Sequence, residues 1–441
     1  MTDKLTEYKP AIVQKAKQAG ETLPKWGWAD PEIWTERMLA ALETGVKGGK
    51  WFSLIDKVFS RENLHRAFQK VKKNQGSAGT DHQTIAEFDS NIEKEIDGLS
   101  QELRDGTYQP RLNRRHYIPK PGTNELRPLG IPCVRDRTVQ NVIRSVIEPI
   151  FEKGFAKQSY GFRPGRGCKD ALRRVDSLLY QKYQWVIDID LKSYFDSIPH
   201  PELMTLIEQQ ISDGRMLKLI ESFLKQGILE GLKEWEPEKG APQGATISPI
   251  CSNIYLNPLD HLMEMNGFEM VRYADDAVIL CKSQEAASRA FQLLQEWVNN
   301  AKLTLHPEKT RILNASLPGG FDFLGYHFEM GHKRPRRKSL KKFKDSIREN
   351  TKRNNGNSTK TIVEKLNPII RGWFGYFKHS AKWIFRGLDG WIRRRFRSIL
   401  RRRQKKKGMS RGFDNQRWPI SLFQEMGLYS LETAHFEACQ S

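Results

Sequence analysis

Two apolar stretches of this 441-residue chain carry aspartates in their midst, and these carboxylates constrain the fold more than any other feature. The first stretch reads WVIDID and the second reads MVRYADDAVILC. Alternation along a strand places Asp188 and Asp190 on one face, with isoleucines on the other. Asp275 and Asp276 lie between two β-type runs, at the position of a hairpin turn. A carboxylate among apolar side chains is costly unless it is paired or bound to a metal ion.

Carboxylates at the ends of adjacent strands can hold two divalent cations about 3.5–4 Å apart. Mg²⁺ prefers oxygen ligands and is commonly held by one or two carboxylates together with substrate phosphates. This arrangement suits nucleotidyl transfer, in which one ion activates a 3′-hydroxyl and the other stabilises the leaving pyrophosphate. The alternative for the Asp-Asp pair alone is ordinary turn chemistry, and an aspartate at a strand end is also a common helix cap.

The excess positive charge of the chain is concentrated in one segment. The net charge is +21, and residues 333–407 hold 27 lysines and arginines against 4 acidic residues. Apolar and aromatic residues recur in this segment at helical spacing, which a disordered basic tail would not keep. The pattern predicts a small helical domain with one strongly basic face that binds nucleic acid.

Composition argues against several other classes of protein. The first 20 residues lack the apolar run of a secretory signal. The longest charge-free stretch, residues 240–259, contains three prolines and many polar residues, so it does not resemble a membrane span. The five cysteines are scattered and never form CxxC, which disfavours a disulfide scaffold and a cysteine zinc site. These features predict a soluble intracellular protein without a membrane partner.

Hydrophobic patterning predicts a mixture of helices and strands without a regular βαβ rhythm, which favours an α+β fold over a doubly wound sheet. Helices are predicted over residues 61–75, 202–228, 245–265 and 285–302, and over a segment beginning near residue 136, where Asp136 could act as the cap. Strands are predicted at 114–120, 126–132, 185–190 and 321–328, with a strand–turn–strand at 270–281.

Seven motifs follow one another in a characteristic order. They read RRHYIPKPGTNELRPLGIP, SYGFRPGRGCKDA, DIDLKSYFDSI, GAPQGATISPICSNIYLNPLD, VRYADD, LTLHPEKTRI and GGFDFLGYHF. This series, with YADD in the place of a YxDD turn, resembles the reverse transcriptases encoded within group II introns. The later motifs RGWFGYFK and RRRFRSILRRR resemble the maturase (X) domain of those proteins. The resemblance covers roughly residues 50–435, and seven ordered motifs are far more specific than YADD alone.

The resemblance implies a right-hand polymerase, in which fingers and palm with an antiparallel sheet precede an α-helical thumb/maturase domain. We expect a helical N-terminal extension at 1–60, fingers and palm at 61–330, the thumb/maturase domain at 333–405, and a short basic segment at 406–441 that could be a reduced DNA-binding region. Many relatives carry a C-terminal HNH nuclease with paired cysteines, and this sequence has no CxxC. Second-strand DNA cleavage is therefore not expected.

The resemblance also assigns roles to individual residues. The expected catalytic and metal-binding residues are Asp190, Asp275 and Asp276, which would hold two Mg²⁺ ions that Mn²⁺ can replace. The residues expected to bind the nucleotide are Lys120, Arg127, Phe195, Gln243 and Lys309. Template or primer contacts are expected from Arg114, Arg163, Pro164, Gly165 and Gly325. RNA or DNA contacts are expected from Arg336, Arg337, Lys341, Lys342, Arg393, Arg394, Arg395, Arg401, Arg402 and Arg403.

Four of the five residues assigned to the nucleotide also have an ordinary alternative role. The ring of Phe195 would clash with a ribose 2′-hydroxyl and select deoxynucleotides, whereas the alternative is a core aromatic residue. Lys120 and Arg127 flank a Pro-Gly turn and could close over phosphates, whereas the alternative is exposed hairpin charge. Lys309 matches a proposed proton donor to the pyrophosphate, although an exposed lysine is common.

The function implied by the resemblance is RNA-directed DNA polymerisation by two-metal nucleotidyl transfer, with binding of group II intron RNA to assist splicing and retrohoming. The partners would be the intron RNA, an RNA template with a DNA primer, target DNA and dNTPs, in the bacterial cytoplasm and on the nucleoid. The alternatives are an RNA-binding splicing cofactor without polymerase activity and a host-adapted reverse transcriptase in repair or phage defence. Phe195 and YADD in place of GDD disfavour an RNA-dependent RNA polymerase.

Overall fold

The computed structural model describes residues 25–119, 126–354, 356–406, 408 and 412–440. The chain forms two compact units. The first unit comprises the residues up to Tyr183 together with Ile187–Ile312, and the second comprises Gln184–Val186 together with the residues from Leu313 onward. Helices and strands alternate irregularly in both, which confirms the predicted mixture of helix and sheet. Among the described residues, no helix is both long enough and apolar enough to cross a membrane.

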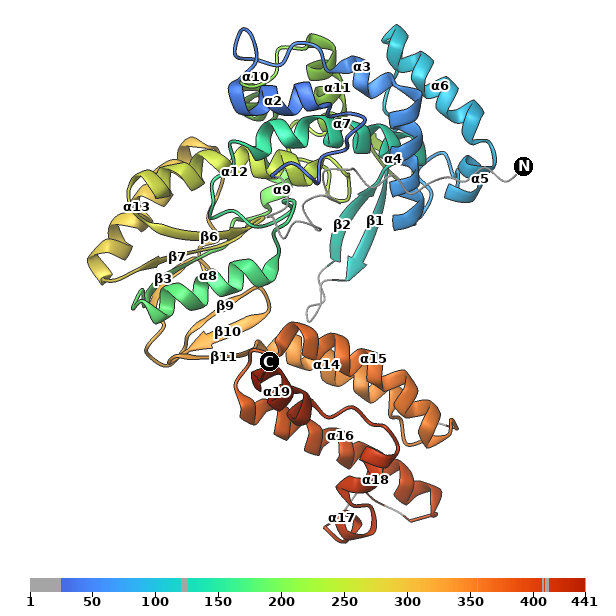
Figure 1. Ribbon diagram of the computed structural model, residues 1–441, viewed down its shortest axis with the longest axis vertical. Coiled ribbons are helices and arrows are strands. Elements are labelled where there is room, and N and C mark those ends of the chain that lie inside the picture. The colour runs from blue at the N-terminus through green and yellow to red at the C-terminus, as the bar shows by residue number, and fades with distance from the viewer. Residues whose placement is uncertain (1–24, 120–125, 355, 407, 409–411, 441) are drawn as a thin grey trace. The chain divides into compact units, whose positions relative to one another are not determined.

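Helices dominate the N-terminal part of the first unit. They are α2 (Glu36–Thr44), α3 (Ile55–Phe59), α4 (Arg61–Asn74), α5 (Ile85–Ser90), α6 (Ile92–Asp105) and α7 (Val134–Glu152). Helix α4 buries Leu64, Phe68 and Val71, the face that the sequence predicts, and packs on α7 (Figure 1). The indole Nε1 of the buried Trp34 donates to the backbone oxygen of Ser145 on α7, so this tryptophan belongs to the core.

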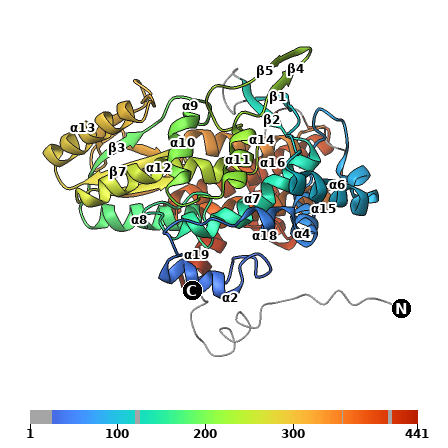
Figure 2. The ribbon, with the colours of Figure 1, turned by 90° about the horizontal axis from the view of Figure 1, so that it is seen from above.

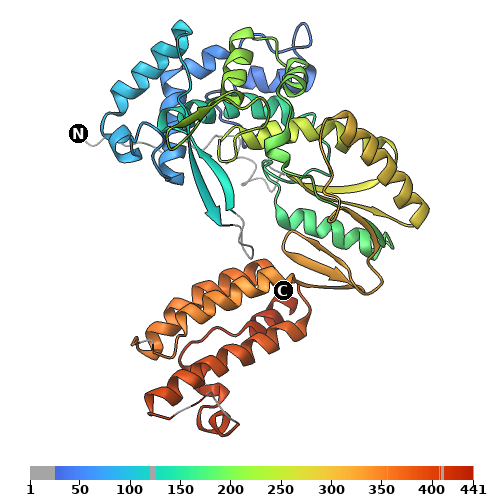
Figure 3. The same ribbon diagram turned by 180° about the vertical axis from the view of Figure 1, so that it is seen from behind.

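A four-stranded sheet carries the first of the seven ordered motifs, RRHYIPKPGTNELRPLGIP. Its strands are β1 (Asn113–Pro119), β2 (Leu126–Ile131), β4 (Ile228–Glu230) and β5 (Lys233–Trp235), in the order β2-β1-β4-β5. Strands β1 and β2 form the predicted antiparallel hairpin, visible in Figure 3, with Arg115 opposite Gly130. Residues 120–125, which include Lys120, lie outside the described residues. Figure 2 shows the β4–β5 hairpin continuing the same sheet.

A second four-stranded sheet carries the carboxylates. Its strands are β6 (Glu269–Tyr273), β7 (Asp276–Cys281), β3 (Trp185–Ile189) and β8 (Arg311–Asn314), in the order β6-β7-β3-β8. The helices that pack on it are α8 (Cys168–Tyr180), α12 (Ser248–Met265) and α13 (Gln284–Asn300). Figure 1 shows α8 on one side of the sheet, with α12 and α13 on the other. The predicted hairpin over 270–281 is confirmed, with Val271 paired with Val278.

One predicted helix is in fact two. In place of the single helix predicted over 202–228, the structure has α10 (His200–Glu208) and α11 (Gly214–Leu224). A short helix, α9 (Tyr194–Ser197), precedes them. The interruption is caused by Asp213, which caps α11: its Oδ1 accepts hydrogen bonds from the backbone N–H groups of Arg215 and Met216. Its Oδ2 accepts from the backbone N–H of Leu54 and of Ile55. The helical pattern alone could not reveal a cap whose second partner lies so far away in the chain.

The prediction that Asp136 caps a helix is wrong. Helix α7 begins at Val134, and Asp136 lies inside its first turn, where it is fully buried. Its carboxylate accepts hydrogen bonds from the Tyr108 hydroxyl at 2.5 Å, the Arg111 backbone N–H at 3.0 Å and the Gln226 amide at 3.2 Å. Asp136 therefore joins α7 to the segments that precede two strands of the first sheet, β1 and β4, and does not cap its own helix.

The second unit combines a small sheet with long helices. The sheet has the order β11-β10-β9 and contains β9 (Phe321–Phe323), β10 (Tyr326–Glu329) and β11 (His332–Pro335). The helices α14 (Arg337–Asn350), α15 (Thr359–Phe377) and α16 (Lys382–Arg403) run alongside one another (Figure 3). The Tyr326 hydroxyl donates to the backbone oxygen of Tyr376, and the Tyr376 hydroxyl donates to that of Leu324, so sheet and helices are joined.

The C-terminal helices share the core of this unit. They are α17 (Phe413–Arg417), α18 (Ile420–Glu425) and α19 (Leu431–Gln440). Trp418, Phe423 and Leu431 are buried in the same apolar cluster as the inner face of α16. Asp389 of α16 is 3% exposed and accepts hydrogen bonds from the backbone N–H groups of Leu431 and Glu432 at the start of α19.

Candidate active site

Asp190 lies directly after β3 and is held by the loop that follows α13. The backbone N–H of His306 donates to the Asp190 backbone oxygen at 2.7 Å. The Thr310 hydroxyl lies within hydrogen-bond distance of both the backbone oxygen and the backbone N–H of Asp190. The Lys309 ammonium is 3.2 Å from Asp190 Oδ2. The structure thus brings together Asp190 and Lys309, two residues that the sequence places 119 positions apart.

The YADD motif forms a tight turn between β6 and β7. Tyr273 ends β6, Asp276 begins β7 opposite it, and Ala274 adopts a left-handed φ of 60°. Burial raises the pKa of Asp275, the negative charge of Asp190 raises it further, and the nearby positive charges of Arg127 and Arg272 oppose the rise. Asp190 and Asp275 therefore lie close enough for their charges to interact across the strand ends.

The donor set fits a hard divalent cation. Two partly buried carboxylates that repel each other are stabilised by a cation between them, and the ammonium of Lys309 already serves as a counter-ion to Asp190. Within the described residues, no group of three or more His, Cys, Asp or Glu side chains is arranged to hold an ion by itself. An ion here would complete its coordination with substrate oxygens and water, as Mg²⁺ commonly does.

Arg127, Phe195 and Gln243, which are also predicted to contact the nucleotide, lie outside the YADD turn and the loop of Lys309. Arg127 is exposed on β2 and acts electrostatically on Asp275 and on Asp196. Phe195 lies on α9, half-buried, and its backbone oxygen accepts a hydrogen bond from Ala241 N–H at 2.7 Å. The Gln243 amide donates to Asp196 Oδ2 at 3.3 Å. Hydrogen bonds at Phe195 and Asp196 therefore join α9 to the segment that precedes α12.

The loop predicted to lie under the template base is packed against the YADD turn. The side chain of Arg163 is buried and donates to Glu152 and to the backbone oxygens of Ala156 and Ser159. Its guanidinium therefore holds the loop from inside, which leaves the half-buried Pro164 and the exposed Gly165, with a φ of 68°, nearer to solvent. The template contact expected of Arg163 stays a prediction, and its observed partners are internal.

Two further predicted contacts also have internal partners. Arg114 donates from Nη2 to the backbone oxygen of Ala78 at 2.7 Å. Gly325, with a φ of 85°, lies in the turn between β9 and β10, where its backbone oxygen accepts from the Arg336 N–H and the Ser339 hydroxyl. The carbonyl of Gly325 thus anchors the start of α14.

Sequence reasoning missed Gly161 and Phe162, which precede Arg163. A Cβ at Gly161 would lie 2.3 Å from the backbone nitrogen of Ala274, so the loop touches the YADD turn directly. Phe162 has a φ of 57°, is 43% exposed, and places its ring centroid 6.2 Å from that of Tyr273. The glycines and proline of GFRPG signal a tight loop, but nothing in the sequence indicates what that loop contacts.

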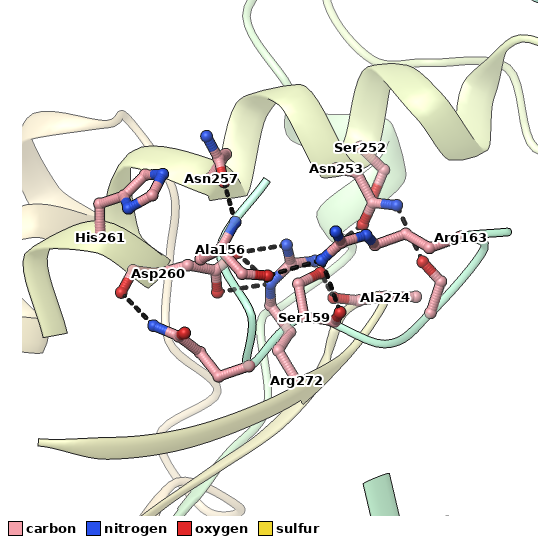
Figure 4. A network of polar contacts seen from close by, with 12 residues as sticks. Ala156, Ser159, Arg163, Ser252, Asn253, Asn257, Asp260, His261, Arg272 and Ala274 are labelled. Carbon is pink, nitrogen blue, oxygen red and sulfur yellow. Dashed lines mark hydrogen bonds and ion pairs between the residues drawn. The ribbon is translucent and has the colours of Figure 1, made fainter. Parts of the chain in front are cut away.

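Sequence reasoning also missed a buried polar network beneath the turn, drawn in Figure 4. Arg272 of β6 and Asp260 of α12 are 1% and 0% exposed in their side chains and form an ion pair. Asn253 of α12 accepts a hydrogen bond from Arg272. The signal was present in the sequence, since a charged residue inside the apolar run MVRYADDAVIL needs a buried partner. The partner itself could not be read from the sequence.

The predicted RNA- or DNA-binding residues of the second unit fall into two groups. The exposed ones are Arg337, Lys341, Lys342, Arg394, Arg402 and Arg403, and the half-buried ones are Arg336, Arg393, Arg395 and Arg401. Arg395 donates to the hydroxyl and the backbone oxygen of Thr351, and Arg401 is 3.3 Å from an Asp414 oxygen. Arg403 is exposed yet donates to the Thr359 hydroxyl at 2.6 Å.

Two family models match this chain. The model described as reverse transcriptase (RNA-dependent DNA polymerase) matches residues 118–328, and the model described as group II intron, maturase-specific domain matches residues 340–418. The first match begins at the end of β1 and ends within β10. The second begins in α14 and ends after α17.

Similar proteins are found by sequence and by structure. Group II intron-encoded protein LtrA of Lactococcus lactis subsp. cremoris is 38% identical over 214 residues, which is 47% of this chain and 35% of LtrA. The chain thus spans about a third of the length of LtrA. Telomerase from Candida albicans in complex with a telomeric RNA fragment aligns with a TM-score of 0.42 at 13% identity, covering 78% of this chain and 64% of that one.

One relative matches over most of its length. Protein YkfC of Escherichia coli (strain K12) is 31% identical over 344 residues, which is 69% of this chain and 86% of YkfC. This extended match, with a reverse transcriptase domain followed by a maturase-specific domain, confirms the resemblance inferred from the ordered motifs. The chain belongs to the family of group II intron-encoded reverse transcriptases with a maturase domain.

Proposed function

We propose that this protein is an RNA-directed DNA polymerase that copies RNA into DNA and binds group II intron RNA to assist splicing and retrohoming. The observation that carries the proposal is the convergence of Asp190, Asp275 and Lys309 at the ends of β3 and β6, inside a reverse transcriptase domain. Asp276 begins β7 beside them. The domain assignment supports the reaction class, and the charges at the strand ends support the location of the site.

Mg²⁺, when bound by Asp190, Asp275 and Asp276 together with substrate oxygens, would supply Lewis-acid activation of the primer 3′-hydroxyl and charge neutralisation at the phosphates. The chain's own side chains supply the rest. Lys309 holds a proton at Nζ next to Asp190, where it can donate to a phosphate oxygen of the leaving group. The exposed Arg127 guanidinium can pair with triphosphate oxygens.

Phe195 would exclude ribonucleotides. It lies on α9, five residues after Asp190, and its backbone is fixed by the hydrogen bond from Ala241. The ring of the buried Tyr194 lies edge-on to the Phe195 ring at 5.4 Å and would limit its movement away from a 2′-hydroxyl. Gln243, fixed through Asp196, would contact the nucleotide from the neighbouring segment. Lys120, which lies outside the described residues, would complete the phosphate contacts with Arg127.

The finer architecture that we propose is that of a right hand. Fingers and palm would occupy residues 61–330 after an extension at 1–60. The thumb/maturase domain would occupy 333–405, followed by a basic segment at 406–441. The exposed cations of α14 and α16 would bind the phosphates of intron RNA, the RNA–DNA duplex and target DNA, which the concentration of charge over 333–407 supports. The Pro164–Gly165 loop would contact the template, and the hairpin around Gly325 the primer. Such a protein would act in the bacterial cytoplasm, on the nucleoid when bound to DNA.

The test is primer extension on an RNA template with Mg²⁺, comparing deoxynucleotides with ribonucleotides. Wild type should extend with deoxynucleotides only, and the double variant Asp275→Ala, Asp276→Ala should not extend. The matched control is Asp345→Ala, which removes a carboxylate on α14 that is ion-paired with Arg348. Wild type that is folded and binds intron RNA but does not extend would refute the polymerase and favour a splicing cofactor.

A further inference from the structure

Arg272 is a buried cation, two residues before the left-handed turn residue Ala274 and three before Asp275, and each of its side-chain nitrogens has a defined partner. Its Nε donates to Asp260 Oδ1 at 2.8 Å and to Oδ2 at 3.0 Å. Its Nη1 donates to Asn253 Oδ1 at 2.9 Å and to the backbone oxygen of Ala274 at 3.0 Å (Figure 4). Apolar residues of similar volume often stabilise a core as well as a buried ion pair does, so stability alone does not account for the pair.

The bond from Arg272 to Ala274 acts on the catalytic turn itself. Ala274 has a φ of 60°, and a residue other than glycine keeps such a conformation only when its surroundings hold it there. The carbonyl that Arg272 binds belongs to the peptide group linking Ala274 to Asp275. The orientation of this peptide plane determines where the Asp275 side chain leaves the backbone. Arg272 therefore controls the position of Asp275 without touching it.

The other partners of Arg272 fix its position relative to the YADD turn. Asn253 accepts from Arg272 and donates from Nδ2 to the backbone oxygen of Gly161 at 2.8 Å. Gly161 in turn packs against the backbone of Ala274. The Arg272 backbone N–H donates to the oxygen of Gln158, and its backbone oxygen accepts from Tyr160 N–H. Through its side chain Arg272 thus connects α12 with the YADD turn, and through its backbone it connects the loop before α8 with β6.

We propose that Arg272 is a positioning residue for polymerisation: anchored by Asp260 and Asn253, it fixes the Ala274–Asp275 peptide so that Asp275 meets the metal-bound substrate in the productive geometry. This inference rests on the proposed polymerase function. The side-chain nitrogens of Arg272 donate to Asp260, Asn253 and the Ala274 carbonyl, so it acts on catalysis through the turn. Residues that orient metal ligands from behind commonly change metal affinity or activity by about 10–100-fold when mutated.

Two variants separate positioning from folding. Arg272→Lys keeps the buried charge but cannot bond Asp260, Asn253 and Ala274 simultaneously, because an ammonium lacks the fork of the guanidinium. The double variant Arg272→Met, Asp260→Leu removes both charges and keeps the volume, so the core stays packed while Ala274 loses its donor. The matched control is Arg135→Lys, which alters an arginine of α7 paired with Glu102 of α6 and touches no part of the turn.

Three readouts should be measured on each protein: thermal unfolding, binding of Mn²⁺ to the enzyme without nucleic acid by electron paramagnetic resonance, and steady-state extension over a range of dNTP concentrations. The double variant should unfold cooperatively as wild type does. Both Arg272 variants should bind Mn²⁺ about 10–100-fold more weakly. Their kcat should fall about 10²-fold, since a 1 Å misplacement costs that much, while KM for the dNTP stays unchanged. Arg135→Lys should match wild type in Mn²⁺ affinity and kcat.

The outcomes distinguish the two proposals. A folded double variant with wild-type Mn²⁺ affinity and wild-type kcat would overturn the positioning role and leave polymerisation standing. A rise in KM for the dNTP with unchanged kcat would also overturn it, because that would place Arg272 in substrate binding. If wild type failed to extend primers, the polymerase proposal would fail, and the Mn²⁺ measurement would still decide whether Arg272 positions the carboxylates.

Discussion

Replacing Gly161 by alanine should impair catalysis by a purely steric route. The added Cβ would lie 2.3 Å from the backbone nitrogen of Ala274 and 2.8 Å from the carbonyl carbon of Tyr273, whereas ordinary contacts begin at 3.4 Å. These neighbours are backbone atoms of the YADD turn, so no flexible side chain can move aside. To relieve the clash the turn must shift by about 1 Å, and a displacement of that size costs about 10²-fold in rate.

The assay is single-turnover extension of a DNA primer on an RNA template, together with thermal unfolding. We expect Gly161→Ala to lower kcat by about 10²-fold and to destabilise the fold by about 1–3 kcal/mol, the usual cost of overpacking. Gly167→Ala is the matched control in the same loop, because its φ of −153° is extended and a Cβ there would meet only an Asp170 oxygen at 3.9 Å. A Gly161→Ala enzyme with wild-type kcat would show that the turn does not need this contact.

Three further predictions test other parts of the structure. Phe195→Ala should raise ribonucleotide incorporation relative to deoxynucleotides in competition extension, and an unchanged ratio would remove Phe195 from sugar selection. Burial raises the pKa of Asp136 to about 6 from 3.8, so the folded state binds a proton more tightly than the unfolded state does. The free energy of unfolding should therefore fall by about 2 kcal/mol as pH rises from 4 to 6. Asp136→Asn should flatten that slope in urea titrations, and an identical slope would contradict the assignment. Arg395→Met should lower the free energy of unfolding by about 1–3 kcal/mol, since it leaves the oxygens of Thr351 without a donor. Arg394→Met should leave stability unchanged and reduce the salt dependence of RNA binding by about one ion. The reverse pattern in melting and filter binding would refute this division into a structural and an RNA-binding arginine.

The elements of the site could be predicted because local patterns specify them. Apolar runs with a period of two predicted β3 and the β6–β7 hairpin, and helical spacing predicted α4. The residue types at the strand ends, aspartates next to apolar strands, indicated oxygen ligands for a cation. Motif order then identified the family, which no single motif could have done.

Partnerships across long sequence separations could not be predicted, because no local pattern encodes them. Arg272 with Asp260 and Asp213 with the start of α3 are paired by tertiary packing alone. The prediction for Asp136 failed for the same reason. Its position near the start of α7 suggests a cap, but its carboxylate is buried and accepts hydrogen bonds from three donors far away in the sequence. The partners of Arg163 could not be predicted for the same reason, since nothing in its motif indicates the ion pair with Glu152.

The bond between Asp389 and the start of α19 matters to anyone who shortens or fuses this protein. Cutting the chain before Leu431 would remove two backbone donors of Asp389, which would keep Ser430 and Arg393 as partners. It would also remove Leu431 and Ala434 from the apolar cluster and expose the α16 side chains that they cover, which is destabilising. Helix α19 is therefore part of the core of this unit, and a protein engineer would do better to attach a tag beyond it than to remove it.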